Sequence, residues 1–413
     1  MPEFIEQIVK MVEPVERPLV EKSDRIRVLQ MVTNLPVGGA QEHTLITIEK
    51  LDRKLFEVSL LCAPDGQWLE RAQNIADLNL IFVNQLTRNI HLVNDLIAFI
   101  KIYQAIKKVK YDIVHTNSSK PGVLGRIAAK LAGVPVIVHT IHGFPFHDFM
   151  SPVWRNFLIL IERFLSSISD KLITVSTLNL EKALRLRLAE RCKFHNIYSG
   201  IDFAKFDIKI DPEQKKRELG IPKTEKIVGM VGRLSEQKAP LDLVKAMPEV
   251  LRFNDSVRFV MVGDGELREK TITLAKKLRV DSKLMILGFR EDVPELLQIF
   301  DVFVLSSLWE GLARTLIEAM YVGLAVVATN VEGIPELVKD ETTGILVPPK
   351  DIAALSKGII AFLSDEKKAQ KLGATARQQI TDLFRADRMV HTLETVYKQA
   401  LLEKGVRIPT THA

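Results

Sequence analysis

The sequence predicts an α/β protein built from two doubly wound domains. Short runs of β-branched and apolar residues alternate with helical patterns over residues 26–200. The alternation starts again at residues 226–232 and continues through residues 324–328. Strands that alternate with helices form parallel sheets, and the restart indicates a second sheet. A chain of 413 residues is long enough for two separate cores.

The first domain is expected over residues 25–200, after an N-terminal tail at residues 1–24. Strands are predicted where β-branched residues gather, and helices where apolar residues recur at helical spacing. The predicted strands are residues 26–32, 56–61, 112–115 and 135–139, and the predicted helices include residues 92–108 and 152–167.

The second domain is expected over residues 201–385, after a connection interpreted from residues 199–202 and the polar stretch 211–226. A last helical pattern falls within the C-terminal segment 386–413. The predicted strands are residues 226–232, 257–263, 284–288, 301–305 and 324–328. In doubly wound proteins ligands bind at the carboxyl ends of the strands, so we expect a cleft there between the domains.

Composition places the chain among ordinary globular proteins, with 47% hydrophobic and 26% charged residues. Only Cys62 and Cys192 are present, far apart, which argues against a disulfide framework or structural zinc and favours a reducing cytoplasm. No run of roughly 18 apolar residues could span a bilayer, and the acidic N-terminus does not suit a secretory signal. Residues 1–200 hold 25 Lys+Arg against 20 Asp+Glu. This excess of positive charge would suit peripheral contact with the inner membrane face. Solvated helix faces explain it as well. No nucleic-acid partner is expected.

The most informative stretch is residues 309–320, where Glu310 and Glu318 stand eight residues apart around a glycine turn and a helix start. The first N–H groups of a helix suit phosphate, because they have no partner within the helix. Carboxylates suit hydroxyl groups, as on a sugar and a ribose. The stretch therefore predicts a nucleotide-sugar site; the alternative is a surface loop that enters an amphipathic helix.

This EGL-x-x-x-LIEAM phrase resembles the donor-site signature of glycosyltransferase family 4, whose members are retaining enzymes with the GT-B fold. The resemblance extends over about residues 25–403 and implies two Rossmann-like domains that face a cleft. It implies that Glu310 contacts the donor sugar hydroxyls and Glu318 the ribose. The backbone that follows Glu310 would hold the diphosphate, over Gly311, Leu312, Ala313, Arg314 and Thr315.

Two further motifs match this family in the expected order. Gly38 and Gly39 resemble its first glycine loop, although Gln41 replaces the usual acid. Gly232, Arg233 and Lys238 resemble its GRL-x-x-x-K motif, in which the two cations bind the donor pyrophosphate and stabilise the leaving group. A tight turn and a solvated charge pair are the respective structural alternatives.

Weaker matches complete the predicted donor site. Gly263 and Gly265 resemble the GDG turn on the nucleotide side, and Phe289 and Arg290 resemble the loop that reads the base. Both turns are common in α/β proteins.

The segment around His142 resembles the HGF motif of the family, whose histidine contacts the donor sugar. His139 is expected to pack within a strand, and His147 is a candidate to face the acceptor. Asn117 and Lys120 are further acceptor candidates, with a helix cap by Ser119 as the structural alternative. A metal site would need Asp148 as a third ligand, and we expect no metal.

The resemblance implies retaining, metal-independent transfer of a sugar, with a nucleotide-diphosphate sugar as donor substrate and no other cofactor. UDP is the commonest nucleotide in the family, and the expected acceptor is a saccharide or a lipid-linked glycan in cell-surface polysaccharide or glycolipid synthesis. Three alternatives stay open: a nonhydrolysing nucleotide-sugar epimerase, an α-glucan or sucrose-type synthase, and a catalytically silent binding module. Donor base, acceptor and oligomeric state are not readable from the sequence.

Overall fold

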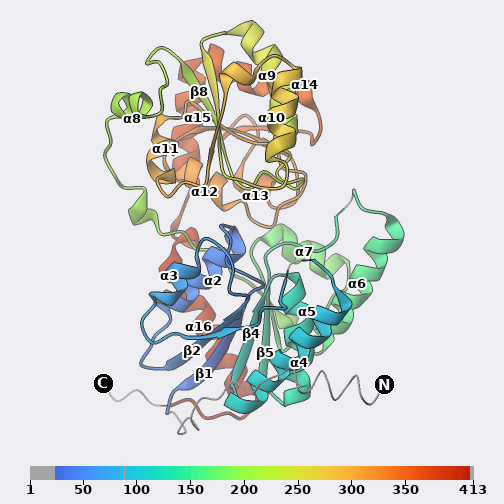
Figure 1. The fold of residues 1–413 in the computed structure, drawn as a ribbon. Helices are drawn as coiled ribbons and strands as arrows, with labels where there is room; N and C mark the ends of the chain where they lie inside the picture. Colours follow the sequence, from blue (N-terminus) through green and yellow to red (C-terminus); the bar gives the residue numbers. More distant parts are fainter. Residues whose placement is uncertain (1–23, 88, 148, 410–413) are drawn as a thin grey trace. The chain divides into compact units, whose positions relative to one another are not determined.

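The computed structural model describes residues 24–87, 89–147 and 149–409, so the N-terminal tail at residues 1–24 lies almost wholly outside the described residues. The chain divides into two compact units. Unit 1 comprises Met1–Val175, Leu180–Ile197 and Met389–Ala413, and unit 2 comprises Ser176–Asn179 and Tyr198–Arg388. Each unit is a parallel sheet with helices on both faces (Figure 1), which confirms the predicted two-domain α/β fold.

Unit 1 contains a seven-stranded sheet in the order β3-β2-β1-β4-β5-β6-β7. All its pairings are parallel. The strands are β1 (Ile26–Met31), β2 (Phe56–Cys62), β3 (Asn79–Phe82), β4 (Ile113–Asn117), β5 (Val136–Ile141), β6 (Lys171–Thr174) and β7 (Phe194–Asn196). The helices are α2 (Gly39–Lys50), α3 (Leu69–Gln73), α4 (Leu92–Val109), α5 (Ser119–Ala132), α6 (Pro152–Ser167), α7 (Thr177–Arg185) and α16 (Ala386–Glu403). The first three residues of α7 and of α16 belong to unit 2.

The two faces of the unit 1 sheet differ in character. Leu29 and Met31 of β1 pack with the apolar sides of α4 and α5. Gln30 lies between them in sequence and therefore points to the opposite face, since side chains alternate along a strand. On that face the side-chain amide of Gln30 donates a hydrogen bond to the hydroxyl of Tyr397, which lies on α16. The C-terminal helix thus completes the first unit.

Unit 2 contains a six-stranded parallel sheet in the order β10-β9-β8-β11-β12-β13. The strands are β8 (Lys226–Val231), β9 (Val257–Val262), β10 (Leu284–Gly288), β11 (Val302–Leu305), β12 (Ala325–Thr329) and β13 (Ile345–Val347). The helices are α8 (Pro212–Glu218), α9 (Pro240–Phe253), α10 (Arg268–Lys277), α11 (Val293–Ile299), α12 (Arg314–Tyr321), α13 (Ile334–Leu337), α14 (Ile352–Ser364) and α15 (Glu366–Gln379).

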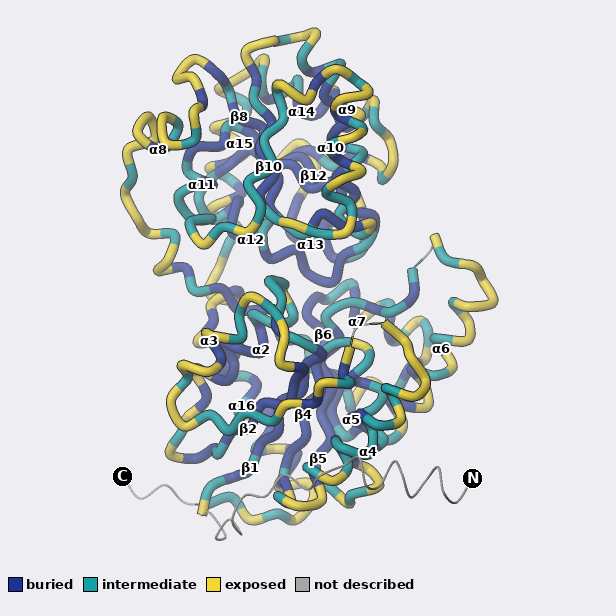
Figure 2. Tube along the Cα trace, in the orientation of Figure 1, coloured by how far each residue is buried: buried dark blue, intermediate teal, exposed yellow. Residues whose placement is uncertain are grey.

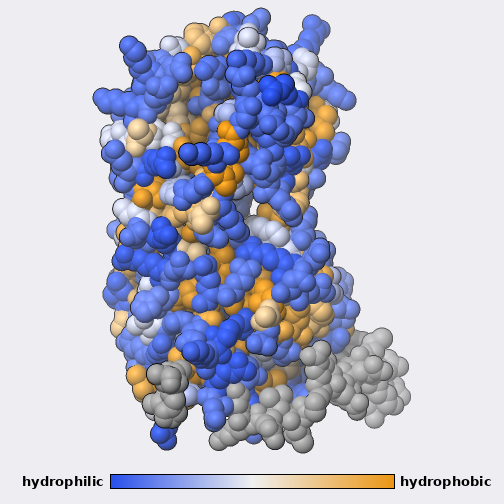
Figure 3. Space-filling model, turned by 90° about the vertical axis from the view of Figure 1, so that its left-hand side faces the viewer, coloured by the Kyte–Doolittle hydropathy of each residue, from blue (hydrophilic) through white to orange (hydrophobic). Residues whose placement is uncertain are grey.

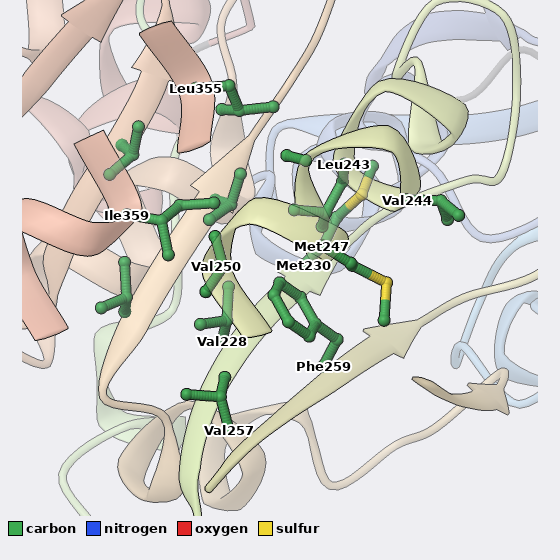
Figure 4. Close-up of a cluster of buried hydrophobic side chains, with 14 of the residues drawn as sticks. Val228, Met230, Leu243, Val244, Met247, Val250, Val257, Phe259, Leu355 and Ile359 are labelled. Atoms are coloured by element: carbon green, nitrogen blue, oxygen red, sulfur yellow. The ribbon is translucent and has the colours of Figure 1, made fainter. Parts of the chain in front are cut away.

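The main core of unit 2 lies between the sheet and helices α9, α10 and α14. Figure 4 shows Met247 and Val250 of α9 directed at Val228 and Phe259 of neighbouring strands. The inner strands of both sheets are buried along most of their length, whereas the edge strands β3 and β10 are only partly buried (Figure 2). Hydrophilic residues cover most of the face in Figure 3, with smaller hydrophobic patches between them. The packing of helices against each sheet fixes the positions of the strand ends that carry the site.

The segment Ser176–Asn179 departs from the predicted domain boundaries, because it lies in unit 2. The backbone N–H of Thr177 donates to Glu336 at 2.9 Å, and Asn179 Nδ2 donates to the Gly311 carbonyl at 3.0 Å. These contacts join distant parts of the chain, so local sequence patterns could not indicate them.

Candidate functional site

Glu310 lies in the turn between β11 and α12 and is almost fully buried. Its carboxylate accepts hydrogen bonds from Lys238 Nζ at 2.5 Å and Ser307 Oγ at 2.6 Å. Gln237 Nε2 lies 3.4 Å from the same carboxylate and donates to the Trp309 carbonyl at 3.1 Å. Strands β8 and β11 are neighbours in the sheet, and residues from the loops after both strands therefore contact the same carboxylate, that of Glu310.

The first turn of α12 has backbone N–H groups that no side chain of the described residues caps. Ala313 occupies the N-cap position, and within the described residues no side chain caps the helix and no acid stands in its first turn. The first N–H groups of a helix attract negative charge, because they have no partner within the helix and lie at the positive end of its dipole. Thr315 Oγ1 is buried there and has no hydrogen-bond partner among the described residues. Glu318 follows one turn later and is also buried.

Three glycines bring the ends of β8, β9 and β10 into backbone contact. Gly232, Gly263 and Gly265 have φ values of +151°, +134° and +158°, which side chains rarely adopt. A Cβ at Gly263 would lie 2.1 Å from the Gly232 carbonyl oxygen. The N–H of Gly263 donates to the Gly288 carbonyl at 2.8 Å. These contacts fix the loop that carries Arg233 and Lys238.

The loop after β10 belongs to a network of charges. Arg290 forms a two-pronged hydrogen bond with Asp292, at 2.7 and 2.5 Å, and Lys215 lies 2.6 Å from the same carboxyl group. The hydrogen bond from Arg290 holds the pKa of Asp292 well below its ordinary range. Phe289 is 37% exposed. The base-reading role of Phe289 and Arg290 stays a prediction.

Glu332 is a residue that the sequence analysis missed. Its carboxylate accepts a hydrogen bond from the backbone N–H of Glu310 at 2.9 Å, and its own φ is +40°. Non-glycine residues with positive φ are uncommon and gather at functional sites. The neighbouring Gly333 is the sequence feature that could have pointed to this turn. A Cβ at Gly333 would lie 2.2 Å from the Gly311 carbonyl oxygen, so glycine is required there.

In unit 1, Gly38 and Gly39 form the start of α2 as predicted. Gly38 is the N-cap in an extended conformation, and within the described residues its helix has no side-chain cap. Glu42 N–H donates to the Gly38 carbonyl at 3.0 Å, which closes the first helical turn. The turn therefore presents backbone groups at the carboxyl end of β1, and its contact with a diphosphate stays a prediction.

His142 follows β5 and is partly buried. Its Nε2 lies 3.1 Å from Asn117 Oδ1, and its ring meets the edge of the His43 ring with centroids 4.7 Å apart. His139 and His115 are buried within β5 and β4. Burial lowers the pKa of His115 to about 3 and that of His139 well below its ordinary value, so both rings are neutral. His139 is packed in its strand as expected.

The acceptor candidates differ in exposure. Asn117 is fully buried. Lys120 donates to the Asn89 carbonyl and lies 2.6 Å from Asp95 Oδ1 at the start of α4. His147 is partly buried. Their contact with an acceptor stays a prediction, whereas the proposed cap by Ser119 is wrong: α5 begins at Ser119, and the N-cap is Ser118, whose side chain makes no capping bond.

No group of three or more His, Cys, Asp or Glu residues within the described parts of the chain is placed to hold a metal ion. Asp148, the third ligand considered for a histidine site, lies outside the described residues. The positive charge near the buried acid Glu310 comes from Lys238.

Comparisons with known proteins show the family of the chain. Residues 37–205 match the model of Glycosyltransferase Family 4, and residues 211–379 match that of Glycosyl transferases group 1. The chain is 34% identical over 373 residues to an Escherichia coli UDP-Gal:alpha-D-GlcNAc-diphosphoundecaprenol alpha-1,3-galactosyltransferase, which covers 89% of this chain and 95% of the relative. It is 28% identical to a Bacillus anthracis N-acetyl-alpha-D-glucosaminyl L-malate synthase, over 78% of this chain and 83% of the relative.

A solved structure shares the fold. Anabaena Alr3699/HepE in complex with UDP and glucose superposes with a TM-score of 0.78 at 21% identity, over 91% of this chain and 100% of that one. The likeness shows a common fold, and the identity to the Escherichia coli enzyme shows common descent. The chain is therefore a glycosyltransferase of family 4 with the GT-B fold, as the motifs around Glu310 and Lys238 predicted.

Proposed function

We propose that this glycosyltransferase moves a hexose from a UDP-sugar to a lipid-linked glycan acceptor in cell-surface polysaccharide or glycolipid synthesis, with retention at the anomeric carbon. The observation that carries the proposal is the buried Glu310 carboxylate held by Lys238 beside the uncapped start of α12. The Escherichia coli relative transfers galactose from UDP-Gal to a GlcNAc-diphosphoundecaprenol. Structures of Alr3699/HepE contain UDP or UDP-glucose.

The charges of unit 2 support a transfer that needs no divalent metal. As the bond between the anomeric carbon and the diphosphate oxygen breaks, negative charge develops on the diphosphate. Arg233, Lys238 and the first N–H groups of α12 are the groups that would stabilise it. The acceptor hydroxyl forms its new bond on the same face of the sugar and gives its proton to the departing diphosphate. Glu310 would orient the sugar hydroxyls, and Glu318 the ribose.

The test is a donor panel. Purified protein is mixed with UDP-, GDP- and ADP-sugars in EDTA, and the melting temperature and released nucleotide are measured. A shift and slow release with one UDP-sugar, together with transfer to a polyprenyl-diphosphate GlcNAc analogue, support the proposal. Interconversion of two UDP-sugars without an acceptor would favour the epimerase instead. No shift with any donor would favour a binding module of another kind.

The protein is also proposed to act in the cytoplasm, at the surface of an anionic membrane. Within the described residues, no helix is long and apolar enough to cross a bilayer. Helix α6 buries Ile159 and Leu165 against its unit but leaves Trp154, Leu160 and Phe164 about 60% exposed. Residues 149–193, which include α6 and α7, hold eight Lys+Arg against four Asp+Glu. An apolar face beside basic residues suits the headgroup region of anionic lipids.

We expect purified protein to float with vesicles that contain phosphatidylglycerol and to stay behind with phosphatidylcholine alone. The double change Trp154→Ser and Leu160→Ser should weaken this binding roughly tenfold, because both side chains lose apolar contact with lipid. Phe253→Ser is the matched control, since Phe253 of α9 is 50% exposed but lies in unit 2. Equal loss in the control, or concentration-dependent dimerisation through α6 without vesicle binding, would contradict the proposal.

A further inference from the structure

Ser307 is a fully buried serine in the loop that follows β11, three residues before Glu310. Its hydroxyl donates a hydrogen bond to Glu310 Oε1 at 2.6 Å. Its backbone is held as well, because Thr329 Oγ1 of the neighbouring strand β12 donates to the Ser307 carbonyl at 2.5 Å. The hydroxyl therefore lies beside the carboxylate on a short side chain whose backbone is tied to the sheet.

This contact differs from an ordinary helix cap. In a capping box, a serine side chain accepts from the backbone N–H three residues later, and the acid at that position reaches back to the serine N–H. Here the N–H of Glu310 donates to Glu332 instead, at 2.9 Å. Helix α12 begins only at Arg314, with Ala313 as its N-cap. The Ser307 hydroxyl thus bonds the Glu310 side chain itself, which a role in starting the helix does not require.

The two oxygens of the Glu310 carboxylate have different surroundings. An ionised carboxylate only accepts hydrogen bonds, so the Ser307 hydroxyl and the Lys238 ammonium group are both donors to it. Both bind Oε1, at 2.6 and 2.5 Å. Oε2 lies 3.4 Å from Gln237 Nε2, whose shorter hydrogen bond, at 3.1 Å, goes to the Trp309 carbonyl. Oε2 is therefore the oxygen that keeps most of its capacity to accept.

Ser307 and Lys238 contribute differently to this arrangement. The last torsion of a glutamate side chain is broad, so a carboxylate held by one donor can rotate about it. A lysine ammonium group is a point charge on a flexible stem, and it can follow such a rotation. The Ser307 hydroxyl lies on a short, fully buried side chain and cannot follow it as far. The serine therefore fixes the plane of the carboxylate, and with it the direction of the second oxygen.

We propose that Ser307 is a positioning residue for the donor sugar: it holds one oxygen of Glu310 and so directs the other at the sugar hydroxyls. The serine does not touch the substrate and acts through Glu310 alone. The inference rests on the proposed sugar contact of Glu310. The hydrogen bond between the two side chains is a property of the protein without substrate, so it can be tested separately.

The first test is a pair of high-resolution crystal structures without substrate, of the wild type and of Ser307→Ala. We expect one carboxylate plane at Glu310 in the wild type, and a rotated plane or several orientations in the variant. An unchanged plane in Ser307→Ala would overturn the inference, because Lys238 would then suffice. A wild-type Ser307 hydroxyl directed away from Glu310 would also overturn it, whichever sugar the protein transfers.

Kinetics connect this contact with transfer. Ser307→Ala should lower kcat/KM for the sugar donor roughly tenfold, the effect of one lost hydrogen bond to a charged group. Affinity for UDP alone should stay unchanged, because UDP lacks the sugar. Ser356→Ala is the matched control, since it removes another fully buried serine hydroxyl of unit 2, which donates to the Ile352 carbonyl on α14 at 2.9 Å. An equal loss of UDP affinity in Ser307→Ala would indicate general damage to the loop and overturn the inference.

Donors that lack one sugar hydroxyl identify the contact through which Ser307 acts. Removing the hydroxyl that Glu310 binds should cost the wild type roughly tenfold in kcat/KM but Ser307→Ala at most about twofold, since the variant has already lost that contact. Losses that multiply for every deoxy donor would overturn the inference. A wild type that uses a GDP- or ADP-sugar would overturn the UDP part of the proposed function, and the same comparison with that donor then decides the inference. A wild type that uses no nucleotide sugar would overturn both.

Discussion

At the scale of single residues, Glu310 and Lys238 depend on each other. Glu310 is 4% exposed, so its charge is stabilised by the ammonium group 2.5 Å away and the Ser307 hydroxyl rather than by water. Lys238 in turn is held where the diphosphate is expected, instead of moving freely on its flexible stem. Under the proposed function, one carboxylate would therefore both orient the donor sugar and position the cation that stabilises the leaving group.

Glu310→Gln should lower kcat/KM at least 100-fold, because the sugar loses a charged hydrogen-bond acceptor and Lys238 loses its counter-charge. The amide keeps the shape of the carboxylate, so we expect the melting temperature to remain within a few degrees of the wild type. The control is Glu341→Gln, which removes an exposed ion-pair partner of Lys368 in the same unit. Activity within threefold of the wild type would exclude the assigned role.

The sequence predicts some parts of this site better than others. Glu310, Glu318, Arg233 and Lys238 stand at fixed spacings beside strand ends, so their positions follow from local pattern. Glu332 was missed because its contact with Glu310 crosses 22 residues and depends on a backbone conformation unusual for a side chain.

At the scale of secondary-structure elements, α6 shows both what local pattern predicts and where it stops. Its bounds, Pro152–Ser167, agree with the sequence prediction because proline suits the first helical turn and apolar residues recur at helical spacing. The sequence could not decide whether Glu162 faces water. In the structure Glu162 is buried and forms a two-pronged ion pair with Arg126 of α5, at 2.9 and 3.0 Å. That partner is 36 residues away.

Removing one member of this pair should destabilise unit 1. Glu162→Leu leaves the Arg126 charge buried, and breaking a buried pair costs about 3–5 kcal/mol. The double change Arg126→Met and Glu162→Leu should recover most of that loss, because it leaves no unpaired charge. The free energy of unfolding is measured by denaturant unfolding. The signal is the fluorescence of Trp68 and Trp154, in a protein that also carries Trp309→Phe. If the double variant were as unstable as the single one, packing around α6 rather than charge would hold the two helices together.

At the scale of the whole molecule, the two units should respond differently to acid. Unit 1 buries His115 and His139 as neutral rings, and burial lowers the pKa of both. In the unfolded chain these rings bind protons below about pH 6.5. Unit 2 instead contains Asp292, whose pKa is held below its ordinary range by the hydrogen bond from Arg290. For Glu225, burial raises the pKa, but the hydrogen bonds from Arg258 and Lys283 together outweigh it, so that pKa is also below its ordinary range. Their charges are lost at much lower pH.

The sign of both effects follows from proton binding. Where the unfolded state binds more protons than the folded state, stability falls as pH falls. For His115 this window runs from pH 6.5 down to its folded pKa of about 3, whereas for Asp292 it begins near its ordinary value of 3.8. Unit 1 should therefore lose stability between pH 6.5 and 4.5, while unit 2 changes little in that range.

Scanning calorimetry from pH 7.5 to 4.5 measures this difference as two transitions that separate on acidification. We expect the transition of unit 1 to move down several degrees more than that of unit 2. His115→Asn and His139→Asn lower the stability of unit 1 at neutral pH, because they disturb buried contacts, but they should flatten its pH dependence, because the asparagine does not titrate. A matched change at the exposed His391 of α16 should leave the slope unaltered. Parallel shifts of both transitions in the wild type would mean that groups present in each unit, and not the buried histidines of unit 1, govern acid stability.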